Sequence, residues 1–160
     1  MVAGAGAAEL QPWREGRLPA FSLPDTAGAR AELPAGAPVV LHFFATWCEP
    51  CRVEFPALQR LAARASTSGP LKVVAVSVGE VAAPVRKLLA AVPVDFPVLL
   101  DEDRAVARAW KVDTLPTSYV LDENLVPRLV AQTDLAWDEV SVESLLQTIR
   151  AAAAANGGTK

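Results

Sequence analysis

The chain has 160 residues, of which 52% are hydrophobic, and a formal net charge of -3 at pH 7. This length and composition are typical of one domain with a sizeable core. The mild acidic balance, without runs of Lys or Arg, argues against nucleic acid and anionic membrane as partners. No apolar stretch approaches the roughly 20 residues of a membrane span.

The segment from Met1 to Leu18 is rich in Gly and Ala and lacks the basic-then-apolar order of a secretory signal. We expect an N-terminal extension here, either a flexible tail or a docked arm, and its Trp13 does not decide between them. We expect the domain to span residues 19–151 and a C-terminal tail to span residues 152–160. Both a native chain and a soluble piece that has lost a membrane anchor are compatible with these ends.

Apolar runs and turn residues predict alternating strands and helices. In order, the pattern predicts a hairpin over 20–23 and 29–33, a buried strand over 38–44, a helix over 51–65, a buried strand over 71–78, a helix over 81–91, a short strand over 97–100, a short helix over 104–111, a hairpin over 117–121 and 125–131, and a helix over 138–154. This order predicts an α/β, thioredoxin-like sandwich: a central mixed β-sheet flanked by helices, with an N-terminal β-hairpin and an inserted strand-helix segment.

The only two cysteines lie in Trp47-Cys48-Glu49-Pro50-Cys51, at the turn from a predicted strand into a predicted helix. A helix N-terminus offers partial positive charge and free N–H groups that stabilise a thiolate. Cys48 stands at that position, and Cys51, one turn further, can resolve a mixed disulfide. Pro50 fits the first helical turn and fixes the geometry between the sulfurs. The spacing therefore predicts thiol-disulfide exchange.

A structural disulfide and half of a metal site are the alternatives for this cysteine pair. A bridge that closes so small a loop stabilises little. Zinc and iron-sulfur clusters normally need four ligands, whereas the sequence has no third cysteine and His42 is its only histidine. We therefore expect no metal and no cofactor besides the redox-active disulfide itself.

Four separated motifs carry a family resemblance. The segments 42–56, 74–80, 96–101 and 115–117 resemble the ResA/TlpA-like thioredoxins, and the likeness extends over roughly residues 19–149. The resemblance implies a bacterial, extracytoplasmic, often membrane-anchored thiol-disulfide oxidoreductase that reduces client disulfides, notably in apocytochrome c before haem attachment. It implies client protein disulfides or thiols and an upstream thiol electron donor as partners, a membrane protein being one candidate for the donor, and we expect a monomer.

The resemblance also implies roles for single residues. Cys48 would attack the client disulfide and Cys51 would release the product. Pro116 would be a cis-proline that faces the sulfurs, and the backbone beside it would pair with the extended client chain. Trp47 and Leu115 would form an apolar contact rim. The alternatives are an ordinary strand-start proline at Pro116 and core packing for Trp47.

Three glutamates are candidates for tuning the redox chemistry. A carboxylate near a thiolate disfavours the charged sulfur, so Glu49 and Glu54 would make the protein a better reductant. By resemblance, Glu54 is also a partly buried acid that handles protons, and Glu80 would lie near the edge of the active site. Simple solvation is the alternative for Glu49 and Glu54.

His42 departs from the family pattern. It lies six residues before Cys48, on a buried strand, where thioredoxins carry an acid and the ResA-like branch carries an amide. Our hypothesis is that neutral His42, beneath the disulfide, accepts the Cys51 proton near its unperturbed pKa of about 6.5. The alternative is a buried imidazole satisfied by hydrogen bonds.

Three other functions compete with disulfide reduction. A disulfide-forming oxidase of the same fold needs a strongly stabilised Cys48 thiolate, which the glutamates oppose. A peroxiredoxin, which has a related fold, would have Pro where this chain has Leu41 and Thr where it has Ala45, so neither residue of that pattern is present. A non-enzymatic copper-delivery or metal-site-assembly module needs further soft or imidazole ligands, for which a buried His42 is poorly placed.

Overall fold

A six-stranded mixed β-sheet lies at the centre of the computed structural model, which describes residues 10–156. Its strands follow the order β1-β8-β7-β4-β5-β6, and β2 pairs separately with β3. The strands are β1 (Gln11–Pro12), β2 (Ser22–Pro24), β3 (Arg30–Glu32), β4 (Val39–Phe44), β5 (Lys72–Val78), β6 (Val98–Asp101), β7 (Thr117–Leu121) and β8 (Pro127–Ala131). The helices are α2 (Glu49–Ser68), α3 (Ala82–Ala91), α4 (Ala105–Ala109), the 3-10 helix η1 (Trp137–Glu139) and α5 (Val142–Asn156).

Parallel and antiparallel pairing meet at β4. Strand β5 pairs with β4 and β6 with β5 in parallel, whereas β7 is antiparallel to β4 and β8 to β7. In this register His42 lies between Ala75 of β5 and Ser118 of β7. Every residue of β4 is buried, as its near-continuous apolar run predicts. The predicted α/β sandwich with a central mixed sheet is confirmed.

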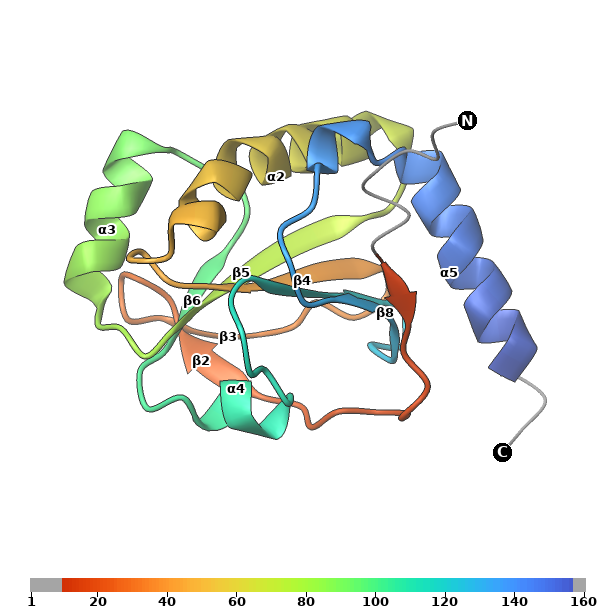
Figure 1. The fold of residues 1–160 in the computed structure, drawn as a ribbon, viewed down its shortest axis with the longest axis horizontal. Helices are drawn as coiled ribbons and strands as arrows, with labels where there is room; N and C mark the ends of the chain where they lie inside the picture. The colour runs from red at the N-terminus through yellow and green to blue at the C-terminus, as the bar shows by residue number, and fades with distance from the viewer. Residues whose placement is uncertain (1–9, 157–160) are drawn as a thin grey trace.

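The two faces of the sheet pack against different elements (Figure 1). Val40 and Phe44 join the apolar cluster that includes α2, α3 and α5. Leu41 and Phe43 join the opposite cluster, which includes the predicted hairpin β2–β3 and α4. Because side chains alternate along a strand, His42 points to the same face as Val40 and Phe44, toward α2. The sheet thus directs this histidine at the helix that begins beside Cys48.

Two predicted helices have different bounds in the structure. Helix α2 begins at Glu49, and continues to Ser68, where the N–H of Gly69 bonds the carbonyl of Ala65 at 3.3 Å. The helix predicted over 104–111 covers only Ala105–Ala109, because the residues on either side, Arg104 and Lys111, have left-handed φ values of 64° and 59°. A left-handed residue cannot continue a right-handed helix.

The predicted final helix over 138–154 consists of two elements. Ser141 separates η1 from α5, and its Oγ accepts a hydrogen bond from the N–H of Ser144 at 3.2 Å. A serine in this position caps a new helix, so the chain turns instead of continuing from η1. The prediction of one helix was wrong because it rested on the apolar stripe of α5 and did not take Ser141 as a cap.

The described part of the N-terminal extension is docked on the sheet. Gln11 and Pro12 pair with β8, and the ring centroid of Trp13 lies 5.3 Å from that of Tyr119. Residues 1–9 and 157–160 lie outside the described part of the chain. Residues 152–156 belong to α5 rather than to a tail. None of the described helices combines the length and apolarity that crossing a membrane requires.

Candidate active site

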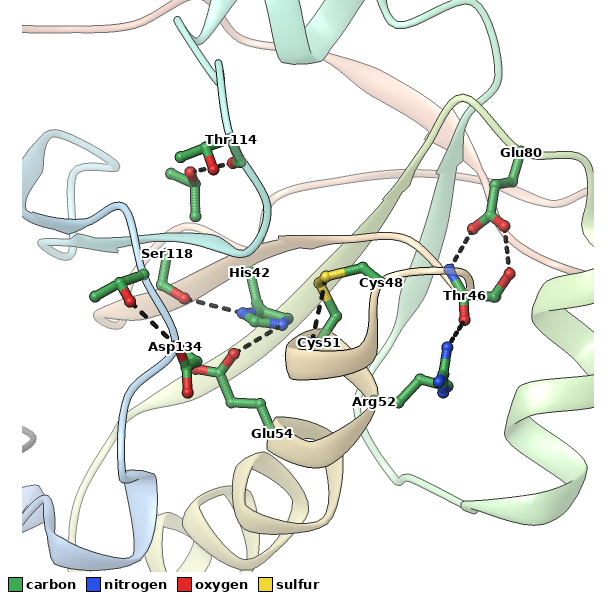
Figure 2. Close-up of a disulfide and its surroundings, with 12 residues drawn as sticks. His42, Thr46, Cys48, Cys51, Arg52, Glu54, Glu80, Thr114, Ser118 and Asp134 are labelled. Atoms are coloured by element: carbon green, nitrogen blue, oxygen red, sulfur yellow. Dashed lines mark hydrogen bonds and ion pairs between the residues drawn. A yellow bond between two sulfur atoms is a disulfide. The ribbon is translucent and has the colours of Figure 1, made fainter.

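Cys48 and Cys51 form a disulfide at the N-terminus of α2 (Figure 2). Cys48 is the N-cap residue, and its Sγ accepts a hydrogen bond from the backbone N–H of Cys51 at 3.4 Å. Pro50 occupies the first turn, where a proline sacrifices no helical hydrogen bond. Cys48 is 6% exposed and Cys51 is fully buried. An incoming sulfur can therefore reach Cys48, while Cys51 is the internal sulfur.

The loop before β7 and the residue before Cys48 border one cavity. Trp47 and Leu115 line this cavity, whose volume is about 360 Å³, together with Val112 and Thr114. Trp47 is 65% exposed, so core packing does not account for it. The Leu115–Pro116 peptide bond is cis, and Leu115 packs against the apolar cluster that contains both cysteines. An edge that combines the apolar Trp47 and Leu115 with polar lining residues and accessible space thus lies beside the disulfide.

Glu80 holds the loop that leads into Cys48. Its Oε1 accepts hydrogen bonds from the backbone N–H of Thr46 at 2.8 Å and from Ser77 Oγ at 2.9 Å. Its Oε2 accepts one from the Thr46 hydroxyl. On the other side, Arg52 donates to the carbonyl of Thr46 at 2.7 Å. Both carboxylate oxygens of Glu80 are therefore engaged in fixing this loop.

His42 and Glu54 lie next to each other in the core, on the inner side of the disulfide (Figure 2). His42 Nε2 and Glu54 Oε1 are 3.7 Å apart, and neither atom has a hydrogen-bond partner among residues 10–156. His42 Nδ1 lies 2.9 Å from Ser118 Oγ. Glu54 Oε2 accepts hydrogen bonds from the backbone N–H of Leu135 at 3.0 Å and the indole N–H of Trp137 at 2.5 Å.

Burial drives both side chains of this pair toward their neutral forms. Desolvation lowers the pKa of His42 from 6.5 to about 3. Desolvation also raises the pKa of Glu54 to about 7, against the hydrogen bonds from Leu135 and Trp137 and with a smaller contribution from the charge of Asp134. The expectation that His42 titrates near 6.5 is therefore wrong, and Glu54 is the group that gains and loses a proton near neutral pH.

The two glutamates of the predicted tuning pair differ in their surroundings. Glu49 is exposed, so solvent and salt screen its charge from the sulfurs. Glu54 is buried and only partly ionised near neutral pH, so the expectation that it acts as a full negative charge needs correction. Within the described residues, no group of three or more His, Cys, Asp and Glu side chains is arranged to hold a metal ion.

Three residues of this site were not predicted from the sequence. Thr46 binds Glu80, Ser118 binds His42, and Trp137 binds Glu54. Trp137 has no local signal, Thr46 lies within the segment 42–56, and Ser118 follows the Leu-Pro-Thr motif on a predicted strand. Its place opposite His42 depends on the register between β4 and β7, which the sequence pattern does not specify.

The sequence model of the AhpC/TSA family matches residues 15–128. The chain belongs to the AhpC/TSA family. The matched region contains the disulfide, the His42–Glu54 pair, Glu80 and the cis peptide bond before Pro116. It ends before Trp137, which is buried against Glu54 in this AhpC/TSA protein.

Individual relatives agree with the motif resemblance, which is confirmed. The thiol-disulfide oxidoreductase ResA of Bacillus subtilis (strain 168) is 41% identical over 118 residues, which are 72% of this chain and 65% of the relative. The thioredoxin-like protein YneN of the same organism is 36% identical over 112 residues, 67% of this chain and 64% of the relative. The chain thus spans slightly less than two thirds of both relatives.

A solved structure matches over a larger share. A Chlorobium tepidum protein described as a DsbE-type thiol:disulfide interchange protein is 33% identical to this AhpC/TSA chain, with a TM-score of 0.73. The match covers 87% of this chain and 97% of that protein. The likeness therefore includes the fold as a whole as well as the segments around the disulfide.

Proposed function

We propose that this AhpC/TSA protein is a thiol-disulfide oxidoreductase that reduces disulfides in client proteins. The observation that carries the proposal is the unequal exposure of two disulfide-bonded cysteines at a helix N-terminus, with Cys48 6% exposed and Cys51 fully buried. One sulfur can meet a client, and the other can act only within the protein. The 41% identity to a relative named as a thiol-disulfide oxidoreductase supports the same activity.

The reaction begins with the reduced protein. The Cys48 thiolate attacks one sulfur of the client disulfide, the client S–S bond breaks, and the other client sulfur leaves as a thiolate. Cys51 then loses its proton and attacks Cys48 Sγ, so the Cys48–Cys51 disulfide forms and the first client sulfur leaves with the electron pair. The client gains two electrons, and an upstream dithiol returns them to the protein. In the disulfide form the backbone N–H of Cys51 donates to Cys48 Sγ. In the reduced protein the same N–H would stabilise the attacking Cys48 thiolate.

Glu54 is the group that we assign to the Cys51 proton. The two residues are three positions apart on α2, so their side chains share one face of the helix, and both are buried. The pKa of Glu54, about 7, suits a base that must accept a proton and give it back near neutral pH. Glu80 acts through Thr46 by holding the active-site loop, and exposed Glu49 has a weaker, screened effect on the sulfurs.

Trp47, Leu115 and Pro116 form the edge that we assign to client binding. The exposed Trp47 and the half-buried Leu115 can contact a client near its cysteines, and the backbone beside the buried Pro116 can pair with an extended client chain. A polypeptide held open around a Cys-x-x-Cys pair, as in apocytochrome c, fits this edge. An extracytoplasmic location, by resemblance to ResA-type proteins, a membrane-bound thiol donor and a monomeric state complete the proposal.

A peroxiredoxin activity is disfavoured by the residues around β4. Leu41 and Ala45 stand where the peroxiredoxin pattern requires Pro and Thr. A disulfide-forming oxidase would need positive charge that strongly stabilises the Cys48 thiolate. The buried side chain on α2 next to the cysteines is instead an acid, Glu54.

A two-way electron-transfer assay tests the proposal. Fully reduced protein is mixed with an equimolar disulfide-bonded peptide that contains Cys-x-x-Cys-His, and thiols are then alkylated and counted by mass spectrometry. We expect two alkylated cysteines in the peptide and none in the protein, with no transfer by the Cys48→Ser variant. Oxidation of the reduced peptide by the disulfide form, without the opposite transfer, would contradict the proposal in favour of the oxidase.

A further inference from the structure

Three buried side chains form a row that the proposed function uses only at one end. Ser118 Oγ lies 2.9 Å from His42 Nδ1, and His42 Nε2 lies 3.7 Å from Glu54 Oε1. His42 is fully buried and is the only histidine of the chain. Figure 2 shows Ser118 joined to one nitrogen of the imidazole ring and Glu54 to the other. The ring thus lies between a hydroxyl, which can donate or accept, and a carboxyl group whose proton comes and goes.

The surroundings of Glu54 decide which oxygen carries its proton. Oε2 accepts hydrogen bonds from two N–H donors, those of Leu135 and Trp137. Two donors directed at one oxygen favour its unprotonated, acceptor role. The proton of the neutral acid therefore belongs on Oε1, which is the atom that faces His42 Nε2. A small approach of these two atoms from 3.7 Å makes a hydrogen bond.

The imidazole can match either form of Glu54 while it stays neutral. When Glu54 is protonated, Oε1–H donates to the lone pair of Nε2, and Nδ1–H donates to Ser118 Oγ. When Glu54 is ionised, Nε2–H donates to Oε1, and Nδ1 accepts from the hydroxyl of Ser118, which rotates. Between the two states the site loses one proton, to solvent in the oxidised protein or to the Cys51 thiolate in the proposed reaction, and no electron moves. The wrong tautomer in either state would place two lone pairs or two protons against each other in the core.

We propose that His42 is a positioning residue that changes tautomer each time Glu54 gains or loses its proton, with the hydroxyl of Ser118 following. Each imidazole nitrogen then faces a group of the matching donor or acceptor kind in both charge states of Glu54. The role of the switch in catalysis rests on the proposed function, in which Glu54 exchanges its proton with Cys51. The switch itself requires neither a client nor reduced cysteines.

Few other groups can interfere with this row. Helix α2 contributes Cys51 and Glu54, and β7 contributes Ser118. The segment after β8 contributes Asp134, whose charge acts on Glu54 in the same direction as burial. The rings of Phe44 and Phe55 cover the imidazole, with centroids 6.2 Å and 6.0 Å from its own. Among the described residues, Asp134 is thus the charged side chain that influences the pair, and burial keeps the pKa of His42 at about 3.

An amide at this position could not serve in the same way. The oxygen and NH₂ group of an asparagine are fixed atoms, so a change of role requires the whole amide to turn over inside the core. An imidazole exchanges the donor and acceptor roles of its two nitrogens by moving a proton, without a change in the position of any heavy atom. The histidine therefore suits a buried acid that changes charge.

NMR of the oxidised protein labelled with ¹⁵N-histidine tests the proposal, because the chain has one histidine and gives one pair of ring nitrogen signals. We expect the Nδ1–H tautomer at about pH 5 and the Nε2–H tautomer at about pH 9. The midpoint of the tautomer change should coincide with the titration of the Glu54 carboxyl group, followed by the chemical shift of its carboxyl carbon, and the pKa of Glu54 is about 7. In Glu54→Gln the tautomer should not change with pH, and in Glu49→Gln, the exposed control, it should change as in the wild type.

Two results would overturn the tautomer switch. One is a single tautomer at every pH while the Glu54 carboxyl titrates. The other is protonation of both ring nitrogens near neutral pH, which would make His42 a cation. The wild-type measurement gives either answer even where a variant fails to fold. Since it uses oxidised protein without a client, its failure is distinct from failure of the peptide reduction assay.

Discussion

Glu80 accepts hydrogen bonds from both the backbone N–H and the hydroxyl of Thr46, which lies 34 positions earlier in the sequence. The contact joins the end of β5 to the loop after β4, and these two strands are parallel neighbours. Their carboxyl ends meet at one edge of the sheet, where Cys48 begins α2. The position of the accessible sulfur thus depends on a residue of another strand-helix unit.

Replacing Glu80 with Ala should loosen this loop. Hydrogen bonds to a charged group contribute about 1.5–3 kcal/mol each when measured by deletion. Because the bonds of Glu80 share one loop, we expect the free energy of unfolding to fall by about 2–3 kcal/mol in total. Urea denaturation measures this change, and the peptide assay should show slower reduction. The exposed control Glu49→Ala should change the stability by less than about 0.5 kcal/mol. A Glu80→Ala protein with wild-type stability and rate would contradict the role of Glu80 in holding this loop.

The His42–Glu54 pair predicts two opposite effects of pH on stability. The pKa of Glu54 is raised in the folded state from 4.5 to about 7, so its contribution to stability is full below 4.5 and is lost as pH rises to 7. The pKa of His42 is lowered from 6.5 to about 3, so its contribution is full above 6.5 and is lost as pH falls to 3. Between pH 4.5 and 6.5 the two slopes cancel.

Replacing Glu54 with Gln should expose the slope that His42 alone produces. Uptake of one proton across the range from pH 6.5 to pH 4.5 changes the free energy of unfolding by about 3 kcal/mol. Relative to the wild type, oxidised Glu54→Gln should therefore lose about 3 kcal/mol of stability between pH 6.5 and pH 4.5. Urea denaturation at the two pH values measures the difference, and Glu49→Gln serves as the exposed control. Parallel pH profiles for the variant and the wild type would contradict the assigned pKa values.

The parts of the site with local signals could be predicted from the sequence. The buried strand β4 has a near-continuous apolar run, the start of α2 has the Cys-x-x-Cys with its proline, and the loop before β7 has Leu-Pro-Thr. The contacts of Glu54 have no such signal. Its partners Leu135 and Trp137 are 81 and 83 positions away, and packing between α2 and the segment before α5 brings them together.

The chemistry of His42 could be predicted only in part. Its position on the strand before the cysteines indicated a buried residue on the inner side of the disulfide. The size of its pKa shift depends on complete desolvation, which residue types alone do not give. The role of Ser118 depends on the register between β4 and β7, because a shift of one residue would turn its side chain to the other face of the sheet.

The Cys51→Ser variant should accumulate a mixed disulfide. Cys48 is the accessible sulfur, so it can still attack a client, but no internal thiol remains to release the product. We expect mass spectrometry without reductant to show a covalent complex with the disulfide-bonded peptide. The matched variant Cys48→Ser should form almost none, because Cys51 is buried. Equal trapping by both variants would contradict the assignment of the attacking sulfur.

Replacing Trp47 with Ala should impair the use of protein clients more than the use of small disulfides. Trp47 is 65% exposed beside the cavity, so its loss should leave the stability nearly unchanged. A contact aromatic of this kind contributes about 1–2 kcal/mol, which is about tenfold in kcat/KM for the peptide. Reduction of glutathione disulfide should keep its wild-type rate. Val53→Ala, another exposed apolar residue on α2, is the control. Equal losses with both substrates would argue against client contact by Trp47.

The reduction potential of the Cys48–Cys51 couple tests the central claim most directly. It is measured at neutral pH by equilibrating the protein with dithiothreitol or glutathione buffers and quantifying the alkylated thiols. We predict a value near or below the potential of about -270 mV found for thioredoxin, which lets electrons flow from this dithiol to client disulfides. A value near the potential of about -120 mV of a strong disulfide-forming oxidase would contradict the account and make this protein a donor of disulfides.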